Sequence, residues 1–399
     1  DVTGTVTADA IHVHGGGNIA TNDAFGVGAL VNNTTGTSNT AVGTQALEAN
    51  ILGSNNAAVG HNALGAYEAN NSTAVGYNAL SIATGVENQA FGTRALQGTT
   101  TGQENTAVGR SAMVTNTSGS FNTAVGKQAL QNNTTASNNT AVGYKALLLN
   151  ETGAYNTAVG GDALYSNAAP NNTAVGYQAG YTNTSGTNNT LSGYQAGYTL
   201  NSNYNAVFGY ASLKFNTGSL NTAVGALVMG GNAGAGSYNT AVGYTALSLV
   251  TSGSANVAIG SGDGATYNGP LALNQSGSNN VAIGAGSLQA NTTASNNTAV
   301  GYQAGYTNTV GTINTFIGYK SGYSSNVIGT AGNTAVGYET GVNLDTGYYN
   351  SFFGVDGSIG GAGGSTTTGS NNAFFGGAAG FSNTTASYNT AIGIQALKS

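Results

Sequence analysis

Residues 122–138 read NTAVGKQALQNNTTASN, and residues 139–155 repeat the same pattern as NTAVGYKALLLNETGAY. The glycine that follows Ala-Val recurs about 22 times between Gly26 and Gly393, and most steps between these glycines are 16 to 18 residues long. A short, fixed period of this kind indicates stacked units that contact only their neighbours. A unit of about 17 residues is too short for a helical hairpin, and its glycine-punctuated, β-branched pattern is typical of short strands and turns. The sequence therefore predicts an all-β chain, a parallel β-solenoid (β-roll) of about 22 coils.

The composition of the 399-residue chain excludes several classes of protein. Only 5% of the residues are charged, against about 25% in an ordinary globular domain, yet 40% are hydrophobic, which argues against disorder. The seven Lys and Arg residues are too few for a nucleic-acid-binding surface, so we expect no nucleic-acid partner. No run of about 18 apolar residues is present, and we expect no membrane insertion. Because cysteine is absent, we expect no disulfide and no thiolate metal site. We also expect no cofactor.

Asparagine stands four residues before the repeated glycine in every coil but one, where Ser72 takes its place. Asparagine tolerates turn geometry, and its amide can hydrogen-bond to the equivalent side chain in the coils above and below. We therefore interpret this column as a turn ladder rather than as part of an active site. Representative members are Asn39, Asn122, Asn139 and Asn221.

Two adjacent apolar residues precede the glycine in each coil. Neighbours on a strand point to opposite faces, so one of the two fills the coil and the other lies outside it. An unbroken outer apolar stripe would be a very large exposed patch, and strands with continuous apolar runs are typically buried on both faces. We therefore expect a parallel homotrimer with the outer stripe on its axis. The positions assigned to the core and subunit interface include Val42, Val125, Val142, Ile283 and Phe353.

The segment after the glycine, such as Tyr144-Lys145-Ala146-Leu147, predicts a second strand whose fourth residue is usually Leu. Where that fourth residue is Gly, an aromatic residue often follows at once, as in Gly305-Tyr306 and Gly380-Phe381. We interpret this exchange as volume compensation within one packed layer.

Four of the seven cationic residues lie one or two residues after the glycine in successive coils: Arg94, Arg110, Lys127 and Lys145. They form either a solvated edge that pairs with Glu87 and Glu104 or a ladder that contacts an anionic surface polysaccharide. Tyrosine is frequent directly after the glycine. An exposed tyrosine column would be an aromatic ladder for sugars, whereas a buried one would belong to the subunit interface, the alternative that we favour.

Residues 280–287, NVAIGAGS, resemble the head repeat of YadA-type trimeric autotransporter adhesins. The form NTAVGYQA, at residues 172–179 and 297–304, is similar to repeats of phage tail fibres and related surface proteins. The resemblance covers nearly the whole chain and implies a left-handed, trimeric parallel β-roll that displays binding surfaces. The chain departs from the adhesin pattern in its longer coils, and it shows no stalk coiled coil, membrane anchor or self-cleaving C-terminal chaperone.

Residues 1–20 do not follow the repeat, and we expect them to form an N-terminal cap or junction before a solenoid repeat domain at residues 21–399. His12 and His14 are two residues apart in the first segment and would share one face of an extended chain. We interpret them as an ordinary surface pair rather than as a metal site.

These features predict a non-enzymatic fibre or adhesin shaft of a virion or cell surface, extracellular, which presents binding surfaces to host or surface glycans. The expected partners are further copies of the chain in a homotrimer, and a surface polysaccharide or receptor. One alternative is the head of a bacterial trimeric autotransporter-type adhesin. A second is an ice-binding solenoid, because Thr precedes Ala-Val in many coils. A third is a phage polysaccharide depolymerase with Glu87 and Glu104 as its carboxylate pair.

Overall fold

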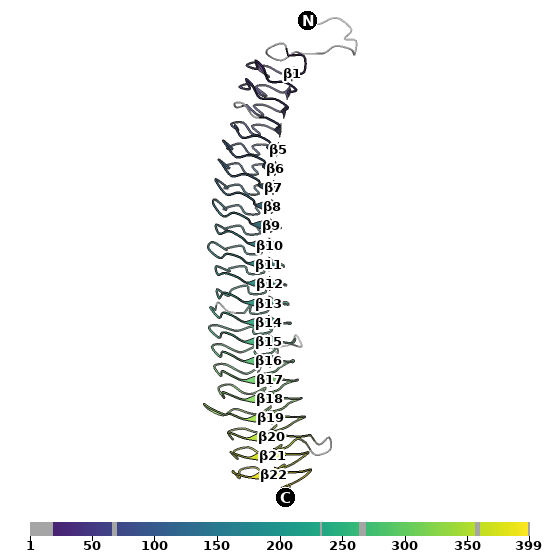
Figure 1. Ribbon diagram of the computed structural model, residues 1–399, viewed down its shortest axis with the longest axis vertical. Coiled ribbons are helices and arrows are strands. Elements are labelled where there is room, and N and C mark those ends of the chain that lie inside the picture. Colours follow the sequence, from purple (N-terminus) through teal and green to yellow (C-terminus); the bar gives the residue numbers. More distant parts are fainter. Residues whose placement is uncertain (1–18, 66–69, 232–233, 263–268, 356–359, 398–399) are drawn as a thin grey trace. The chain divides into compact units, whose positions relative to one another are not determined.

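A computed structural model describes residues 19–65, 70–231, 234–262, 269–355 and 360–397. The chain divides into two compact units, Asp1–Asn188 and Asn189–Ser399. Within each unit, every coil contributes one three-residue strand, and successive strands follow one another in label order (Figure 1). The described ranges contain no helix, which confirms the prediction of an all-β parallel solenoid with a repeat of about 17 residues. His12, His14 and residues 1–18 of the predicted cap lie outside these ranges.

The strands of the first unit pair in parallel and in chain order, with equivalent residues of the repeat in register, as in Ala124 beside Ala141. They are β1 (Asp23–Phe25), β2 (Thr40–Val42), β3 (Ala57–Val59), β4 (Thr73–Val75), β5 (Gln89–Phe91), β6 (Thr106–Val108), β7 (Thr123–Val125), β8 (Thr140–Val142), β9 (Thr157–Val159) and β10 (Thr173–Val175).

The second unit repeats this arrangement, again with parallel neighbours in register, as in Ala282 beside Ala299. Its strands are β11 (Thr190–Ser192), β12 (Ala206–Phe208), β13 (Thr222–Val224), β14 (Thr240–Val242), β15 (Val257–Ile259), β16 (Val281–Ile283), β17 (Thr298–Val300), β18 (Thr315–Ile317), β19 (Thr334–Val336), β20 (Ser351–Phe353), β21 (Ala373–Phe375) and β22 (Thr390–Ile392).

The core of a coil is narrow and consists of small residues. In the coil of β7, Ala124 at the centre of the strand is fully buried, and Ala129 and Leu130 are fully buried beyond the glycine. Backbone hydrogen bonds join each coil to both neighbours: the Thr123 N–H donates to the Asn139 carbonyl at 2.8 Å. Each coil therefore adds one thin core layer, as expected from the evenly spread Ala, Val and Leu of the sequence.

The expected second strand is wrong: the segment after the glycine is a turn with alternating backbone conformation. Lys145 and Leu147 have φ values of 54° and 52°, in the left-handed region that side chains normally avoid. The N–H groups of these two residues donate to different neighbouring coils. The Lys145 N–H donates back to the Lys127 carbonyl at 3.1 Å, and the Leu147 N–H donates forward to the Ala163 carbonyl at 3.0 Å. The turn is therefore hydrogen-bonded to both neighbouring coils without being a strand.

The core does show the predicted volume compensation, in which an aromatic ring fills the space beside a Gly. The prediction of which aromatic residue fills that space is wrong. Gly305 leaves space that the ring of Phe316 fills, because a Cβ on Gly305 would lie 2.7 Å from Phe316 Cδ2. Phe316 occupies the buried central position of β18, where most coils have Ala. Tyr306, the residue expected to compensate, stacks instead on Tyr323 with ring centroids 5.1 Å apart. The large residue thus enters from the strand and not from the turn.

Candidate binding surfaces

The predicted asparagine column is a buried hydrogen-bonded ladder that joins successive coils. Asn122 Oδ1 accepts from the Asn139 backbone N–H at 2.9 Å, and Asn122 Nδ2 donates to the Ala136 carbonyl at 2.9 Å. Asn122 Nδ2 also lies 3.1 Å from Asn105 Oδ1 in the preceding coil. The ladder therefore runs mainly from side chain to backbone, with side-chain contacts added between some coils.

Asn39 and Asn221 make the same pair of bonds, and Asn139 makes only one of them. The Asn56 and Asn239 N–H groups donate to the Oδ1 atoms of Asn39 and Asn221 at 3.0 and 2.9 Å. Asn139 Oδ1 accepts from the Asn156 N–H at 2.9 Å, but its buried Nδ2 has no hydrogen-bond partner. All of these side chains are at most 2% exposed, so they stabilise the fold and are not available to a ligand.

A second asparagine column, which was not predicted from the sequence, lies inside the coils as well. Asn133 Nδ2 donates to Asn116 Oδ1 at 2.7 Å and to the Ala136 carbonyl at 3.0 Å. Asn291 Nδ2 repeats the contact with Asn274 Oδ1 at 2.7 Å in the second unit. The recurrence of Asn ten residues before the glycine is the sequence pattern that could have predicted this column. The residues around each Asn are polar, so the segment resembles an exposed turn and its composition does not indicate a buried side chain.

The apolar pair before the glycine divides between the inside and the outside of the coil. The first residue, Ala in most coils, is buried, and the second points outward. Val42, Val125, Val142 and Ile283 are each 36 to 38% exposed in the single chain. Phe353 is partly buried and stacks on Phe375 with ring centroids 5.0 Å apart. All five predicted interface positions therefore belong to one outward column, and none of them fills the coil interior.

Threonine lies on the same outward face as Val. The two residues flank the buried Ala on the strand, and residues two apart on a strand point to the same side. In β7 the burial pattern is partly exposed Thr123, buried Ala124 and exposed Val125, and β6, β8 and β9 show the same pattern. The outward face of each parallel sheet thus consists of two columns, one hydroxyl-bearing and one apolar. We name these two columns together the Thr-Val face.

Aromatic side chains form two further columns beyond the glycine corner. In the column directly after the glycine, Tyr302, Tyr319 and Tyr338 stack on one another with centroid separations of 5.4 and 5.1 Å. In the column five residues after the glycine, Tyr165 stacks on Tyr181 at 4.9 Å. Many of the tyrosines in the first column are 39 to 56% exposed in the single chain. Because the rings face one another, their edges and hydroxyls rather than their faces are directed to solvent.

The four predicted glycan contacts are brought together on this same side of the first unit. Arg94, Arg110 and Lys127 are exposed and Lys145 is partly exposed. Lys127 and Lys145 place their Nζ atoms 5.7 and 5.0 Å from the centre of the Tyr144 ring. Arg110 and Lys127 line a hollow of about 180 Å³ together with Ser111 and Gln128.

Glu87 and Glu104 do not pair with these cations. Both carboxylates are exposed and stand at left-handed turn residues before the strand, whereas the cations follow the glycine beyond it. None of the four cations forms an ion pair with any residue that the structure describes. Among the described residues the predicted pairing with Glu87 and Glu104 is therefore not seen, and neither glutamate lines the hollow between Arg110 and Lys127.

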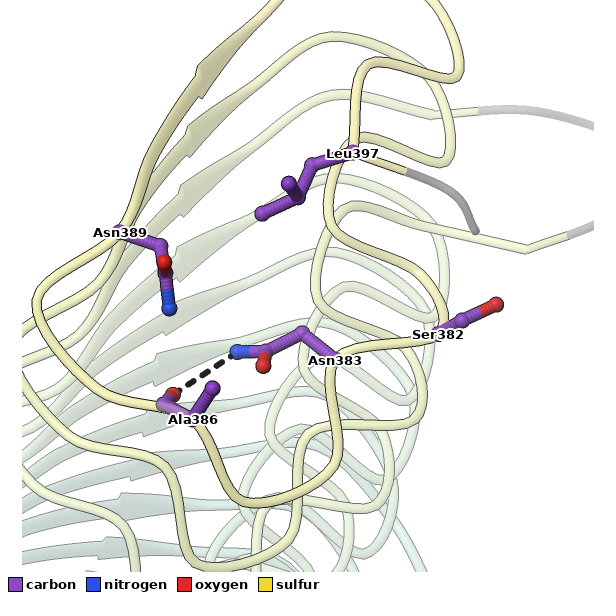
Figure 2. A pocket seen from close by; sticks show the side chains of 5 residues that line it. All are labelled: Ser382, Asn383, Ala386, Asn389 and Leu397. Atoms are coloured by element: carbon purple, nitrogen blue, oxygen red, sulfur yellow. Dashed lines mark hydrogen bonds between the residues drawn. The ribbon is translucent and has the colours of Figure 1, made fainter.

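A second hollow, of about 230 Å³, lies at the last coil of the second unit (Figure 2). Asn383, Asn389 and Leu397 point toward one another across it, and Asn383 Nδ2 donates to the Ala386 carbonyl at 3.0 Å. These residues occupy columns that are buried in the interior coils, where the following coil covers them. The hollow is thus the uncovered inside of a coil rather than a separate binding site.

Within the described ranges, no group of three or more His, Cys, Asp or Glu residues is placed to hold a metal ion. Nor do those ranges contain a helix long and apolar enough to cross a membrane. No family model, curated protein or solved structure matches the chain, and its resemblance to adhesin-head and tail-fibre repeats stays a prediction from the sequence motifs.

Proposed function

We propose that the chain is the repetitive shaft of an extracellular fibre, carried by a virion or a cell surface, in which three left-handed copies associate through the Thr-Val face. The observation that carries the proposal is the outward apolar column, which repeats in register from coil to coil within each unit. A contiguous apolar stripe of this length on a soluble monomer is unusual and marks an association surface.

The size of the apolar column supports association between subunits. Full burial of a Val side chain contributes about 1.5–3 kcal/mol, so covering the exposed third of each Val contributes roughly 0.5–1 kcal/mol. Over the ten strands β1 to β10 the sum is roughly 5–10 kcal/mol, of the same order as the about 4–15 kcal/mol that association costs. The twelve strands β11 to β22 add a comparable amount. A column as long as this one can therefore hold subunits together, although a single coil could not.

The test is the mass of the purified full chain in solution, measured by sedimentation equilibrium. We expect three times the chain mass for the native sequence. The triple variant Val108→Asp, Val125→Asp, Val142→Asp places charges on the Thr-Val face of three successive coils and should be monomeric, because these carboxylates would be buried against another subunit.

A matched control introduces the same three negative charges in the same three coils, but at positions outside the Thr-Val face. Thr101, Ser118 and Thr135 are exposed and lie in the same three coils as the valines, seven residues earlier in each. The triple variant of these residues to Asp should keep the native mass. A monomeric native chain, or equal dissociation of both triple variants, would remove the proposal.

A second candidate function, ice binding, is favoured by one specific observation. The Thr and Val columns share one face and repeat in register, which gives a regular array of hydroxyl and methyl groups. If this array orders water, the chain should show thermal hysteresis, and Thr106→Ala, Thr123→Ala, Thr140→Ala should abolish it. The fibre proposal expects no thermal hysteresis and an unchanged mass for that threonine variant.

A further inference from the structure

We propose that Arg94, Arg110, Lys127 and Lys145, which we name the cationic ladder, bind an extended acidic polysaccharide that runs along the coil stack of the first unit. This inference goes beyond the shaft role proposed above, and it does not depend on subunit association.

Three members of the cationic ladder share neighbours from one coil to the next, and the fourth, Arg94, lies one coil earlier. Arg110 and Lys127 border the same hollow of about 180 Å³. Lys127 and Lys145 approach the same Tyr144 ring, at 5.7 and 5.0 Å from its centre. Arg94 precedes Arg110 by one coil. Because parallel strands are about 4.8 Å apart, four successive coils present four positive charges in a row about 15 Å long.

No residue that the structure describes forms an ion pair with a member of the cationic ladder. Asp162 makes only the smallest contribution to the raised pKa of Lys145, at one end of the row. Outside the cationic ladder the chain is acidic, with 13 Asp and Glu against the three Lys and Arg that remain of the seven. Like charges one coil apart repel one another, and an anionic ligand would relieve that repulsion.

The hollow between Arg110 and Lys127 offers groups that suit a sugar acid. The guanidinium of Arg110 can hold a carboxylate or sulfate through two parallel hydrogen bonds, and Lys127 adds a mobile ammonium group. The Ser111 hydroxyl and the Gln128 amide line the same hollow. Gln128 Nε2 donates to Gln131 Oε1 at 2.7 Å, which fixes the amide in place. A polyanion with hydroxyl groups between its charges would meet both kinds of partner.

The aromatic residues beside the cationic ladder argue against a neutral glycan or a nucleic acid. Binding of bases, and of uncharged sugars, relies on free aromatic faces. Lys127 and Lys145 lie over Tyr144, and Lys145 also lies 6.0 Å from the centre of Tyr165, whose ring stacks on Tyr181. The faces of the Tyr144 and Tyr165 rings are thus covered by lysine side chains or by another ring. A ligand would therefore be bound mainly through the positive charges.

The experiment measures binding of the full chain to immobilised dextran sulfate, polygalacturonate, neutral dextran and a single-stranded DNA oligonucleotide, each at low and moderate salt. We expect binding to one or both acidic polysaccharides, weakened by salt, and none to neutral dextran. Sulfated and carboxylated ligands are distinguished by which of the first two is retained.

The variants use residues that the repeat itself tolerates. Thr stands directly after the glycine at Thr44 and Thr93, so Arg110→Thr, Lys127→Thr should fold normally. The charge-matched control is Lys214→Gln, Lys320→Gln, which removes two cations outside the cationic ladder at positions where other coils have Gln. We expect the first double variant to lose at least about tenfold in affinity and the control to stay within about twofold.

Three outcomes would overturn the inference: no binding of the native chain to either acidic polysaccharide, equal loss in both double variants, or DNA bound as tightly as the polysaccharides. Sedimentation of the same samples reports subunit association separately. A native chain that is monomeric yet binds through the cationic ladder would reject the fibre proposal alone, and a trimer that does not bind would reject this one alone.

Discussion

Phe316 occupies the space into which a Leu side chain at Gly322 would extend. A Cβ on Gly322 would overlap the Phe316 ring, and both residues belong to the coil of β18. In the common coil the same two positions are Ala and Leu, as in Ala124 and Leu130. The large side chain has thus moved from the turn to the strand while the layer remains filled.

This exchange predicts strong coupling between the two positions. Phe316→Ala alone leaves a cavity and should cost about 3–5 kcal/mol. Gly322→Leu alone overpacks the layer and should cost about 1–3 kcal/mol or more. The double variant restores the Ala and Leu of the common coil and should recover much of the loss, with a coupling energy of about 1–3 kcal/mol.

The measurement for this pair is native-state hydrogen exchange of the β18 coil, because a solenoid unfolds locally and one global midpoint would average over coils. Phe121→Ala is a suitable control, since that ring is 49% exposed and should contribute little. Additive losses in the double variant would show that Phe316 and Gly322 do not share one packed space.

The repeat, the parallel stacking and the asparagine turn column could be predicted from the sequence, because each follows from the period of about 17 residues. The sequence was not sufficient for the segment after the glycine. Tyr144-Lys145-Ala146-Leu147 has strand-like composition, but Lys145 and Leu147 have positive φ, and residue type rarely reveals that choice for residues other than Gly, Asn and Asp.

The candidate site was predicted only in part for a similar reason. The spacing of Arg94, Arg110, Lys127 and Lys145 placed them on neighbouring coils, which the structure shows. Their separation from Glu87 and Glu104 could not be predicted, because it depends on how the three-residue strand and the glycine corner divide the coil into faces. The repeat period shows which residues of successive coils are neighbours, but it does not show which residues of one coil lie on the same face.

Gly160 and Gly161 are adjacent, and substitutions at these two positions test the backbone conformation at the glycine that follows the strand. Gly160 has φ +136°, and a Cβ there would lie 2.5 Å from the Gly176 carbonyl oxygen of the next coil. Gly160→Ala should therefore destabilise its coil by at least about 1–3 kcal/mol, from backbone strain and the clash together. The loss should appear as faster hydrogen exchange in the coils of β9 and β10.

Gly161→Ala is the matched control for this substitution. A Cβ on Gly161 meets only Tyr177 Cδ2 at 3.4 Å, an ordinary contact, and other coils carry side chains there. We expect its exchange rates to stay near those of the native chain. If both variants were equally stable, the glycine corner would not have the conformation described above.

The asparagine ladder predicts a graded response at a single position. Asn122→Ala removes the acceptor for the buried Asn139 N–H and should cost about 1–3 kcal/mol. Asn122→Ser should cost less, because the natural exception, Ser72, still accepts from the Asn88 N–H through Oγ at 3.2 Å. Native-state hydrogen exchange at the Asn139 N–H and in the coils of β7 and β8 distinguishes the two variants.

Asn32→Ala provides the control for the ladder variants, since Asn32 is exposed and its bond to the Glu48 carbonyl lies at the surface. Its effect should be within about 0.5 kcal/mol. An Ala variant at position 122 that is as stable as this control would mean that the ladder does not hold the coils together.

The cationic ladder has a definite pH dependence. The pKa of Lys145 lies above its ordinary value of 10.5, mainly because its side chain hydrogen-bonds to that of Tyr144, with further contributions from nearby negative charge. Because its pKa is raised, Lys145 keeps its positive charge at pH 10.5 and loses it only as pH rises through the higher folded-state value. Binding of an acidic polysaccharide should therefore be level between about pH 6 and pH 9 and fall only above about pH 10.5.

Arginine substitutions test whether lysine deprotonation causes that fall. Arg occurs naturally at both positions of the cationic ladder, at Arg110 and at Arg94, so Lys127→Arg and Lys145→Arg are compatible with the turn. Because arginine stays protonated above pH 12, the double variant should bind dextran sulfate with little change up to about pH 11, whereas the native chain weakens. A decline of native binding near pH 7, or an identical high-pH decline in the arginine variant, would show that other groups control the interaction.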